Sequence, residues 1–263
     1  MRAGLYYIYI VAKNSFEQWK KVIFQMFNHI VFLLFSLYLY SYVYELLPSL
    51  HDKLPYSNAI WSMSIYFVVF WLSLRSLEKT FRDDIKSGNI EIYLLRPLSY
   101  TWQKVLQQIG QGLIPFLSAL LLSVIVDYFL VGLPVMHMPV WTWILALVAI
   151  FILSQILTVF IYVLCGLTGF WLDDSEPIYF VVSKLIMIFG GAWVPVAFFP
   201  KTLQLIAEYS PFGASLGLSF AMYPNFAEHF GVLVLNICFW IIATAVLVWI
   251  VSERGMRNLR ING

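Results

Sequence analysis

The sequence predicts an all-α integral membrane protein with six transmembrane helices. Its residues are 61% hydrophobic and only 11% charged, whereas charged residues make up about a quarter of an ordinary soluble domain. The mean hydropathy is +0.82, and the apolar residues fall in long runs. A backbone that crosses hydrocarbon must pair its polar groups internally, so an apolar run of roughly 20 residues is typical of a spanning helix. We expect residues 1–263 to form a single transmembrane domain.

Six apolar segments approach or exceed the length of one crossing. They are 22–44, 57–74, 109–131, 140–171, 179–199 and 230–251. Segment 57–74 is short but uncharged, and segment 140–171 is long enough that we expect it to tilt or to extend into the interface.

Three titratable side chains lie within these segments. We expect His29 to form a helix-packing pair with Asn28, Asp127 to be interfacial, and Lys184 to sit near the cytoplasmic start of the fifth span. An extracellular gate contact is a second interpretation of Asp127. Proton or ion relays usually lie at mid-membrane, so these positions do not favour an ion-coupled transporter.

The distribution of Lys and Arg predicts the orientation. With a cytoplasmic N-terminus, fourteen of the sixteen lie inside, and only Lys53 and Lys201 lie outside. Cytoplasmic loops are enriched in these residues. We therefore expect both termini in the cytoplasm and the chain in the plasma or inner membrane.

Residues 1–21 favour an interfacial helix that leads into the first span. Ser15 and Gln18 can form a capping box, and Trp19, Ile23 and Phe27 recur at helical spacing. The alternative is that these residues are only the flank of the first span. No signal-peptide cleavage pattern is evident.

Segment 200–229 contains prolines and glycines that interrupt an apolar sequence. Its parts 203–209 and 215–222 are too short to span. We expect re-entrant or surface helices on the outer side, because irregular backbone at membrane depth must be covered by protein or line a water-filled cavity. A disordered loop is the alternative.

Segment 75–104 is the longest charged connection and holds six of the sixteen Lys and Arg residues. Leu77, Phe81 and Ile85 make one apolar helical face, and Gly88 can end that helix in the left-handed conformation. Asn89 can cap a second short helix that Pro97 stops. This shape suits docking into a groove on a soluble partner. The alternative is a solvated loop whose cations only set the topology.

The run from Asp84 to Ser99, which reads DIKSGNIEIYLLRPLS, resembles the signature of ABC-2 type transporter permeases. A second similarity begins at the run FWLDD, residues 170–174, and continues through the glycines and prolines of the fifth-span region. The resemblance extends over essentially the whole chain.

The resemblance implies the transmembrane subunit of an ATP-driven exporter, acting as a pair of permeases, homodimeric or heterodimeric, with two ABC ATPase subunits. The loop 75–104 would be the coupling element. The residues implied for ATPase coupling are Asp83, Asp84, Lys86, Gly88, Ile90, Glu91, Leu94, Arg96 and Pro97. Those implied for a gate and dimer interface are Gly190, Gly191, Pro195, Phe199, Pro200, Pro211 and Phe212.

The dipeptide Gly-Lys is absent, so the chain has no phosphate-binding loop of the Gly-x-x-x-x-Gly-Lys type. We expect no cofactor on this chain, and ATP and Mg²⁺ on the partner ATPase. The cargo is expected to be amphipathic, drug-like or lipid-like, because the lining should be apolar and aromatic.

Other functions fit the sequence less well. A net charge of +2 with cations confined to loops does not indicate nucleic-acid binding. A membrane-embedded enzyme would need a convergent polar cluster. Asp173, Asp174 and Glu176 could suggest a metal site, but a solvated acidic turn fits better because no His or Cys accompanies them.

Overall fold

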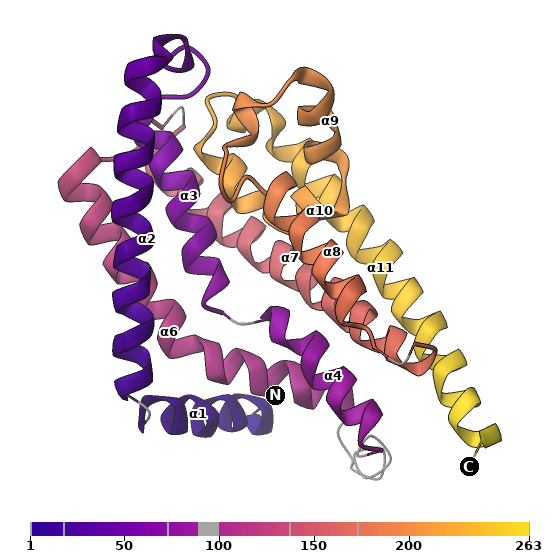
Figure 1. Ribbon diagram of the computed structural model, residues 1–263. Helices are drawn as coiled ribbons and strands as arrows, with labels where there is room; N and C mark the ends of the chain where they lie inside the picture. The colour runs from indigo at the N-terminus through magenta and orange to yellow at the C-terminus, as the bar shows by residue number, and fades with distance from the viewer. Residues whose placement is uncertain are drawn as a thin grey trace.

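The computed structural model describes residues 2–17, 19–72, 74–88, 100–136, 138–172 and 174–262, without the side chains of 2, 3, 16 and 256–262. The regular structure of these residues is helical (Figure 1). The α-helices are α1 (Arg2–Glu17), α2 (Trp19–Leu46), α3 (Tyr56–Phe70), α4 (Leu77–Lys86), α6 (Tyr100–Val131), α7 (Val140–Leu167), α8 (Glu176–Phe189), α9 (Lys201–Tyr209), α10 (Pro211–Ala214) and α11 (Phe226–Asn262). Short 3-10 turns are η1 (Pro48–Leu50), η2 (Leu74–Ser76), η3 (Thr168–Phe170), η4 (Val196–Phe198) and η5 (Gly217–Met222).

Four helical stretches among the described residues are long and apolar enough to cross a bilayer alone. They are α2, α6, Val140–Phe170 and Phe226–Gly255. Tyr56–Phe70 and Leu74–Lys86 give a fifth only if they are taken as one span with a bend of 43°. Six continuous spanning helices are therefore not confirmed.

The difference arises at the predicted fifth span, 179–199, which is not one helix. Helix α8 has 14 residues, a rise of about 21 Å, and this is less than the roughly 30 Å of hydrocarbon. It ends at Gly190, and Gly191 follows with a φ of 73°. A left-handed glycine at this position ends the helix, as is common after a helix C-terminus.

Helix α1 lies at the base of α2 and runs across it (Figure 1). It packs along α6, where Gly110 gives it room: a Cβ there would lie 2.8 Å from Val11 Cβ. The predicted capping box at Ser15 is wrong, because α1 continues through Ser15, whose hydroxyl donates to the Val11 carbonyl at 3.0 Å.

The outer segment between α8 and α11 folds back into the bundle instead of forming an open loop. Helix α9 confirms the predicted helix at 203–209, whereas 215–222 is mostly the 3-10 turn η5. Ser154, halfway along α7, donates to the Ala214 carbonyl at 3.1 Å. The Asn58 amide of α3 donates to the Met222 carbonyl at 2.7 Å. Side chains of spanning helices thus pair this irregular backbone, as membrane depth requires.

The structure gives the surroundings of the three side chains singled out within the predicted spans. His29 is buried and packs α2 on α6, with its Nε2 2.7 Å from Ser123 Oγ, while Trp71 Nε1 donates to its Nδ1 at 3.2 Å; no hydrogen bond joins it to Asn28. Asp127, one turn before the end of α6, is fully buried in the protein, and neither carboxylate oxygen has a hydrogen-bond partner among the described residues. Its interfacial position stays a prediction. Lys184 is in the second half of α8, about 12 Å along the helix axis from Glu176.

Candidate functional site

Helix α4 carries the first half of the predicted coupling loop and is packed against the end of α7. Leu77 and Phe81 are fully buried, and Ile85 is partly buried beside them. Gly166 of α7 allows the close approach, because a Cβ there would lie 2.6 Å from Phe81 Cβ and 3.1 Å from the Glu78 carbonyl. The apolar face that the spacing predicts is therefore the face that holds α4 on the membrane domain.

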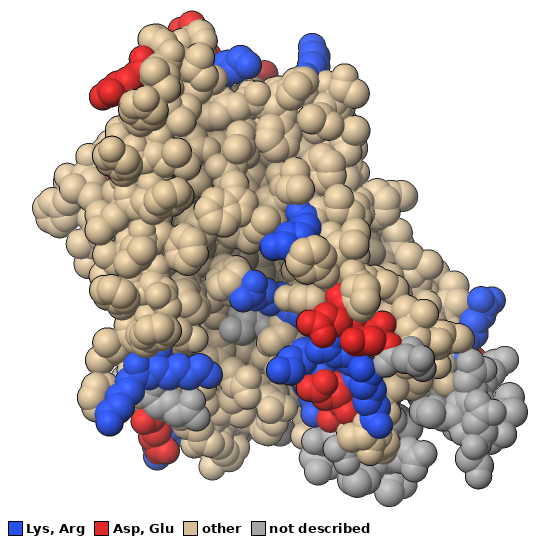
Figure 2. Space-filling model, viewed as in Figure 1, with Lys and Arg blue, Asp and Glu red and all other residues tan. Residues whose placement is uncertain are grey.

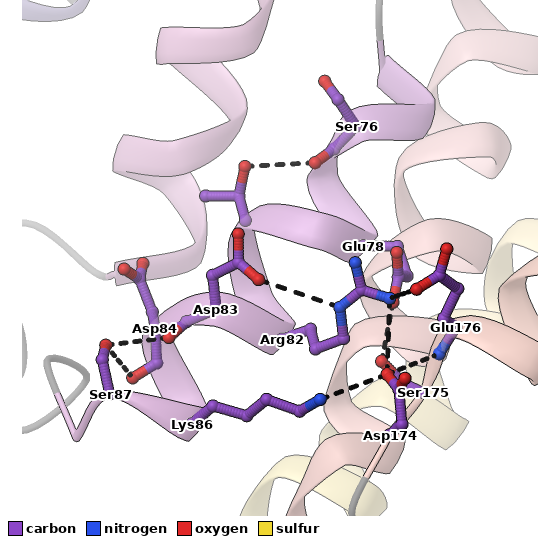
Figure 3. A network of polar contacts seen from close by, with 11 residues as sticks. Ser76, Glu78, Arg82, Asp83, Asp84, Lys86, Ser87, Asp174, Ser175 and Glu176 are labelled. Carbon is purple, nitrogen blue, oxygen red and sulfur yellow. Dashed lines mark hydrogen bonds and ion pairs between the residues drawn. The ribbon is translucent and has the colours of Figure 1, made fainter.

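The polar side of α4 is bound to the connection between α7 and α8 (Figure 3). Glu78 is buried and accepts a hydrogen bond from Ser175 Oγ at 2.6 Å. Arg82 Nη1 lies 3.1 Å from Glu176 Oε2, 3.4 Å from Asp174 Oδ1 and 3.6 Å from Glu78 Oε1. One guanidinium nitrogen thus lies near three carboxylates from two separate parts of the chain.

Asp174 is the exposed end of this network. The backbone N–H of Glu176 donates to Asp174 Oδ1 at 3.2 Å, and Lys86 Nζ lies 3.3 Å from the same oxygen. This hydrogen bond, together with Lys86 and the nearby Arg82, holds the pKa of the Asp174 carboxyl below its ordinary value. Asp174 and Glu176 are exposed, as expected for a solvated acidic turn, and they are also ion-paired to α4. Asp173 lies outside the described residues. Among the described residues, no group of three His, Cys, Asp or Glu side chains has the arrangement of a metal site.

A second ion pair ties α4 to the start of α6. Asp84 Oδ2 lies 2.6 Å from Lys104 Nζ and accepts a hydrogen bond from the Tyr100 hydroxyl, also at 2.6 Å. The Asp84 and Lys104 side chains are 13% and 7% exposed. The pair is shielded from solvent, where an ion pair is screened less by salt than one at the surface.

The junction between α3 and α4 is also fixed by α6. Gln108 Oε1 accepts a hydrogen bond from Ser76 Oγ at 2.7 Å, and its amide donates to Thr80 Oγ1 at 3.1 Å. Gly112 of α6 packs directly on the Leu72 backbone, where any Cβ would clash. Helix α4 is therefore held by α6 both near its start, through Gln108, and near its end, through Lys104. Helices α7 and α8 hold its other side.

The far end of α4 points away from the bundle (Figure 1). Gly88 has a φ of 70° and follows the last turn, as the sequence predicts. Asp83 and Lys86 expose 58% and 46% of their side chains. The predicted coupling residues Ile90, Glu91, Leu94, Arg96 and Pro97, and the second short helix that Asn89 would cap, lie outside the described residues.

The residues predicted for a gate and dimer interface lie at the opposite end of the bundle. Gly190, Gly191 and Pro195 are buried within the subunit. A Cβ on Gly190 would lie 2.7 Å from Leu216 Cβ, so this glycine permits η5 to pack on α8. The others are more accessible: Pro200 is exposed, and Phe199, Pro211 and Phe212 are half-buried. Their role in a dimer contact stays a prediction.

The sequence analysis did not identify Glu78, Arg82, Lys104 and Ser175 as members of the site. One signal could have found the network: Arg82 and Lys86 repeat at one-turn spacing on one helix, and Asp174 and Glu176 offer the opposite charge elsewhere. Spacing alone does not bring the two segments together, because their contact depends on how α4 packs on α7.

Most charged side chains on the face in Figure 2 gather towards the two ends of the molecule, and a few cationic side chains lie between them. A comparison with protein-family models matches residues 30–263 to a family described as ABC-2 family transporter protein. A comparison with curated proteins finds no match.

Proposed function

Because the chain belongs to the ABC-2 family of transporter proteins, we propose that it is the permease subunit of an ATP-driven exporter that works as a pair of permeases with two ABC ATPase subunits. Membership of the family makes it a multi-pass membrane protein of a transporter. ATP and Mg²⁺ would bind to the ATPase subunits, since this chain lacks a phosphate-binding loop of the Gly-Lys type.

The observation that carries the proposal is the bracing of α4 between two parts of the membrane domain. Its Asp84 is bound to α6 through Lys104, and its Arg82 is bound to the start of α8 through Glu176. A force applied at the free end of α4 would reach α3, α6 and α8 together. Helix α4 is therefore suited to act as a rigid lever. Closure of the ATPase subunits would move α4, and α4 would in turn tilt the spans.

We propose six crossings with both termini in the cytoplasm. Both ends of the chain lie at the same end of the bundle (Figure 1), where α4 also lies, and the cation distribution favours that end as the inside. Helix α8 together with the turn η4 would form the fifth crossing. A cysteine introduced at Lys86 should react with an impermeant maleimide only after the cells are opened; labelling of intact cells would contradict this orientation.

The outer segment 200–229 would close the external side and contribute to the contact between two permeases. Val194, just before this segment, is exposed. An exposed apolar side chain at a bundle edge favours contact with protein or lipid over water. Cysteines introduced at Val194 should crosslink two permeases, and their failure to do so in an intact assembly would contradict a dimer contact there.

An ion-coupled transporter is the second candidate, because Asp127 is a fully buried carboxyl without a described partner. Intramembrane carboxyls often act in proton relays. The two functions differ in what Asp127→Asn does: ATP-driven export keeps its rate, whereas a proton-coupled transporter loses transport.

Association with an ATPase tests the proposal directly. The chain should be purified in mild detergent after co-expression with an ABC ATPase encoded beside it. We expect the two to co-purify in equal amounts, with ATPase activity that depends on the permease. A permease that transports without any associated ATPase would contradict the proposed function.

A further inference from the structure

A cavity of about 550 Å³ opens between α2, α3, α7 and α8. Its volume is in the range of ligand-binding pockets. The space-filling view shows this face hollowed, with cationic side chains at the edge of the hollow (Figure 2). Its lining is mainly apolar, and the polar network of α4 is not part of it.

Aromatic rings form one wall of the cavity. Phe32 of α2 stacks on Phe67 of α3 with ring centroids 5.1 Å apart, and Trp193 meets both rings edge-on at 6.3 Å and 6.2 Å. Rings in such a wall bind the apolar part of a ligand through large flat surfaces.

Two cations line the same cavity: Arg75 of the turn η2 and Lys184 of α8. The Arg75 guanidinium lies 3.5 Å from the Phe70 ring centroid, and Lys184 Nζ lies 5.3 Å from that of Phe180. Neither cation forms an ion pair with a described residue, and the cavity lining contains no Asp or Glu. Both side chains are exposed, so an incoming ligand can reach them.

We propose that this cavity binds an amphiphile with an acidic group, whose anion pairs with Arg75 and Lys184 and whose apolar part lies on the wall formed by Phe32, Phe67 and Trp193. Neither cation has a carboxylate beside it in the cavity, so an anionic ligand gains both an ion pair and apolar contact there. The inference names the substrate class of the proposed exporter and rests on that function. A bilayer lipid with an acidic headgroup and a small organic acid share this chemistry.

Two probes with the same aromatic skeleton test the role of charge. Anilinonaphthalene sulfonate carries a sulfonate, and N-phenylnaphthylamine lacks it. The full-length chain is reconstituted in phosphatidylcholine nanodiscs, and binding is measured by fluorescence with empty discs subtracted. We expect the sulfonate to bind about tenfold tighter than the neutral probe, as one charge-assisted hydrogen bond provides.

Variants then locate the binding. Arg75→Gln and Lys184→Gln should each weaken sulfonate binding about threefold, and the double variant about tenfold, which removes the preference for the charged probe. Binding of the neutral probe should stay unchanged, which also shows that the cavity is intact. Lys53→Gln serves as the matched control. Lys53 is an exposed cation that does not line the cavity, so this variant should change neither affinity.

Discs containing phosphatidylglycerol separate the two sources of the anion. Competition by this lipid supports a lipid as the occupant, and sulfonate binding without competition supports a small organic acid. The proposal is overturned if both probes bind equally, if the double variant keeps wild-type sulfonate affinity, or if neither probe binds because a second permease covers the cavity. ATPase co-purification from the same preparations reports on the proposed function separately, so failure of one does not imply failure of the other.

Discussion

Asp84 and Lys104 form a shielded ion pair between α4 and α6, with Oδ2 and Nζ 2.6 Å apart. The Tyr100 hydroxyl donates to the same Asp84 oxygen, so one carboxylate fixes two side chains of the first turns of α6. This contact places the charged end of α4 at a defined position relative to the third span.

Removing both partners of this pair should destabilise the protein by less than the sum of the two single removals. Lys104→Met leaves the shielded Asp84 carboxylate without its cation, which typically costs about 3–5 kcal/mol. Asp84→Asn is the second single variant. The double variant should lose less than the sum, with a coupling of about 0.5–3 kcal/mol. Thermal unfolding of purified protein measures both, and Lys79→Met, an exposed cation on the same helix, is the control. Additive single effects would contradict a direct ion pair.

The contribution of Asp174 should depend on pH in one direction. Its pKa is lowered from the model-peptide value of 3.8, so the stabilisation is present above that value and is lost as the pH falls through the lower folded-state pKa. The melting temperatures of wild type and Asp174→Asn should therefore differ at neutral pH and converge in acid below about pH 4. A difference that grows on acidification would be the opposite of this expectation.

The close approach of α4 to α7 depends on Gly166. A Cβ there lies 2.6 Å from Phe81 Cβ, so Gly166→Ala should force the helices apart and cost about 1–3 kcal/mol. Gly231→Ala is the matched control, because its Cβ has no neighbour within 4 Å. A helical glycine without neighbours normally becomes more stable as alanine. Equal effects of the two substitutions would show that α4 does not pack as described.

The sequence predicts much of this fold because the hydrophobic effect acts on long runs. The bounds of α2, α7 and α11 contain the predicted segments or nearly so, and the face of Leu77, Phe81 and Ile85 follows from helical spacing. The predicted fifth span is not one continuous helix, since hydropathy does not register the break at Gly190 and Gly191.

The polar contacts between α4 and the start of α8 could not be predicted from the sequence. Asp174 and Glu176 lie more than ninety positions from their partner Arg82 in the chain, and local spacing carries no information about such a pair. The cavity could not be predicted for the same reason, because its wall and its cations come from α2, α3, η2, α8 and the connection after α8, which only tertiary packing brings together.

Co-purification of an ABC ATPase with variants of the 83–96 segment tests the central claim most directly. Leu94→Asp places a charge where an apolar anchor is predicted, and truncating or replacing such an anchor typically costs more than about 1–2 kcal/mol of binding. Gly88→Val forces a β-branched residue into a φ of 70°, whereas Gly88→Asn keeps a residue that tolerates this conformation. We predict that Leu94→Asp and Gly88→Val insert normally but lose the ATPase and transport, and that Gly88→Asn keeps both. Stoichiometric ATPase and wild-type transport in the first two variants would show that this segment only sets the topology.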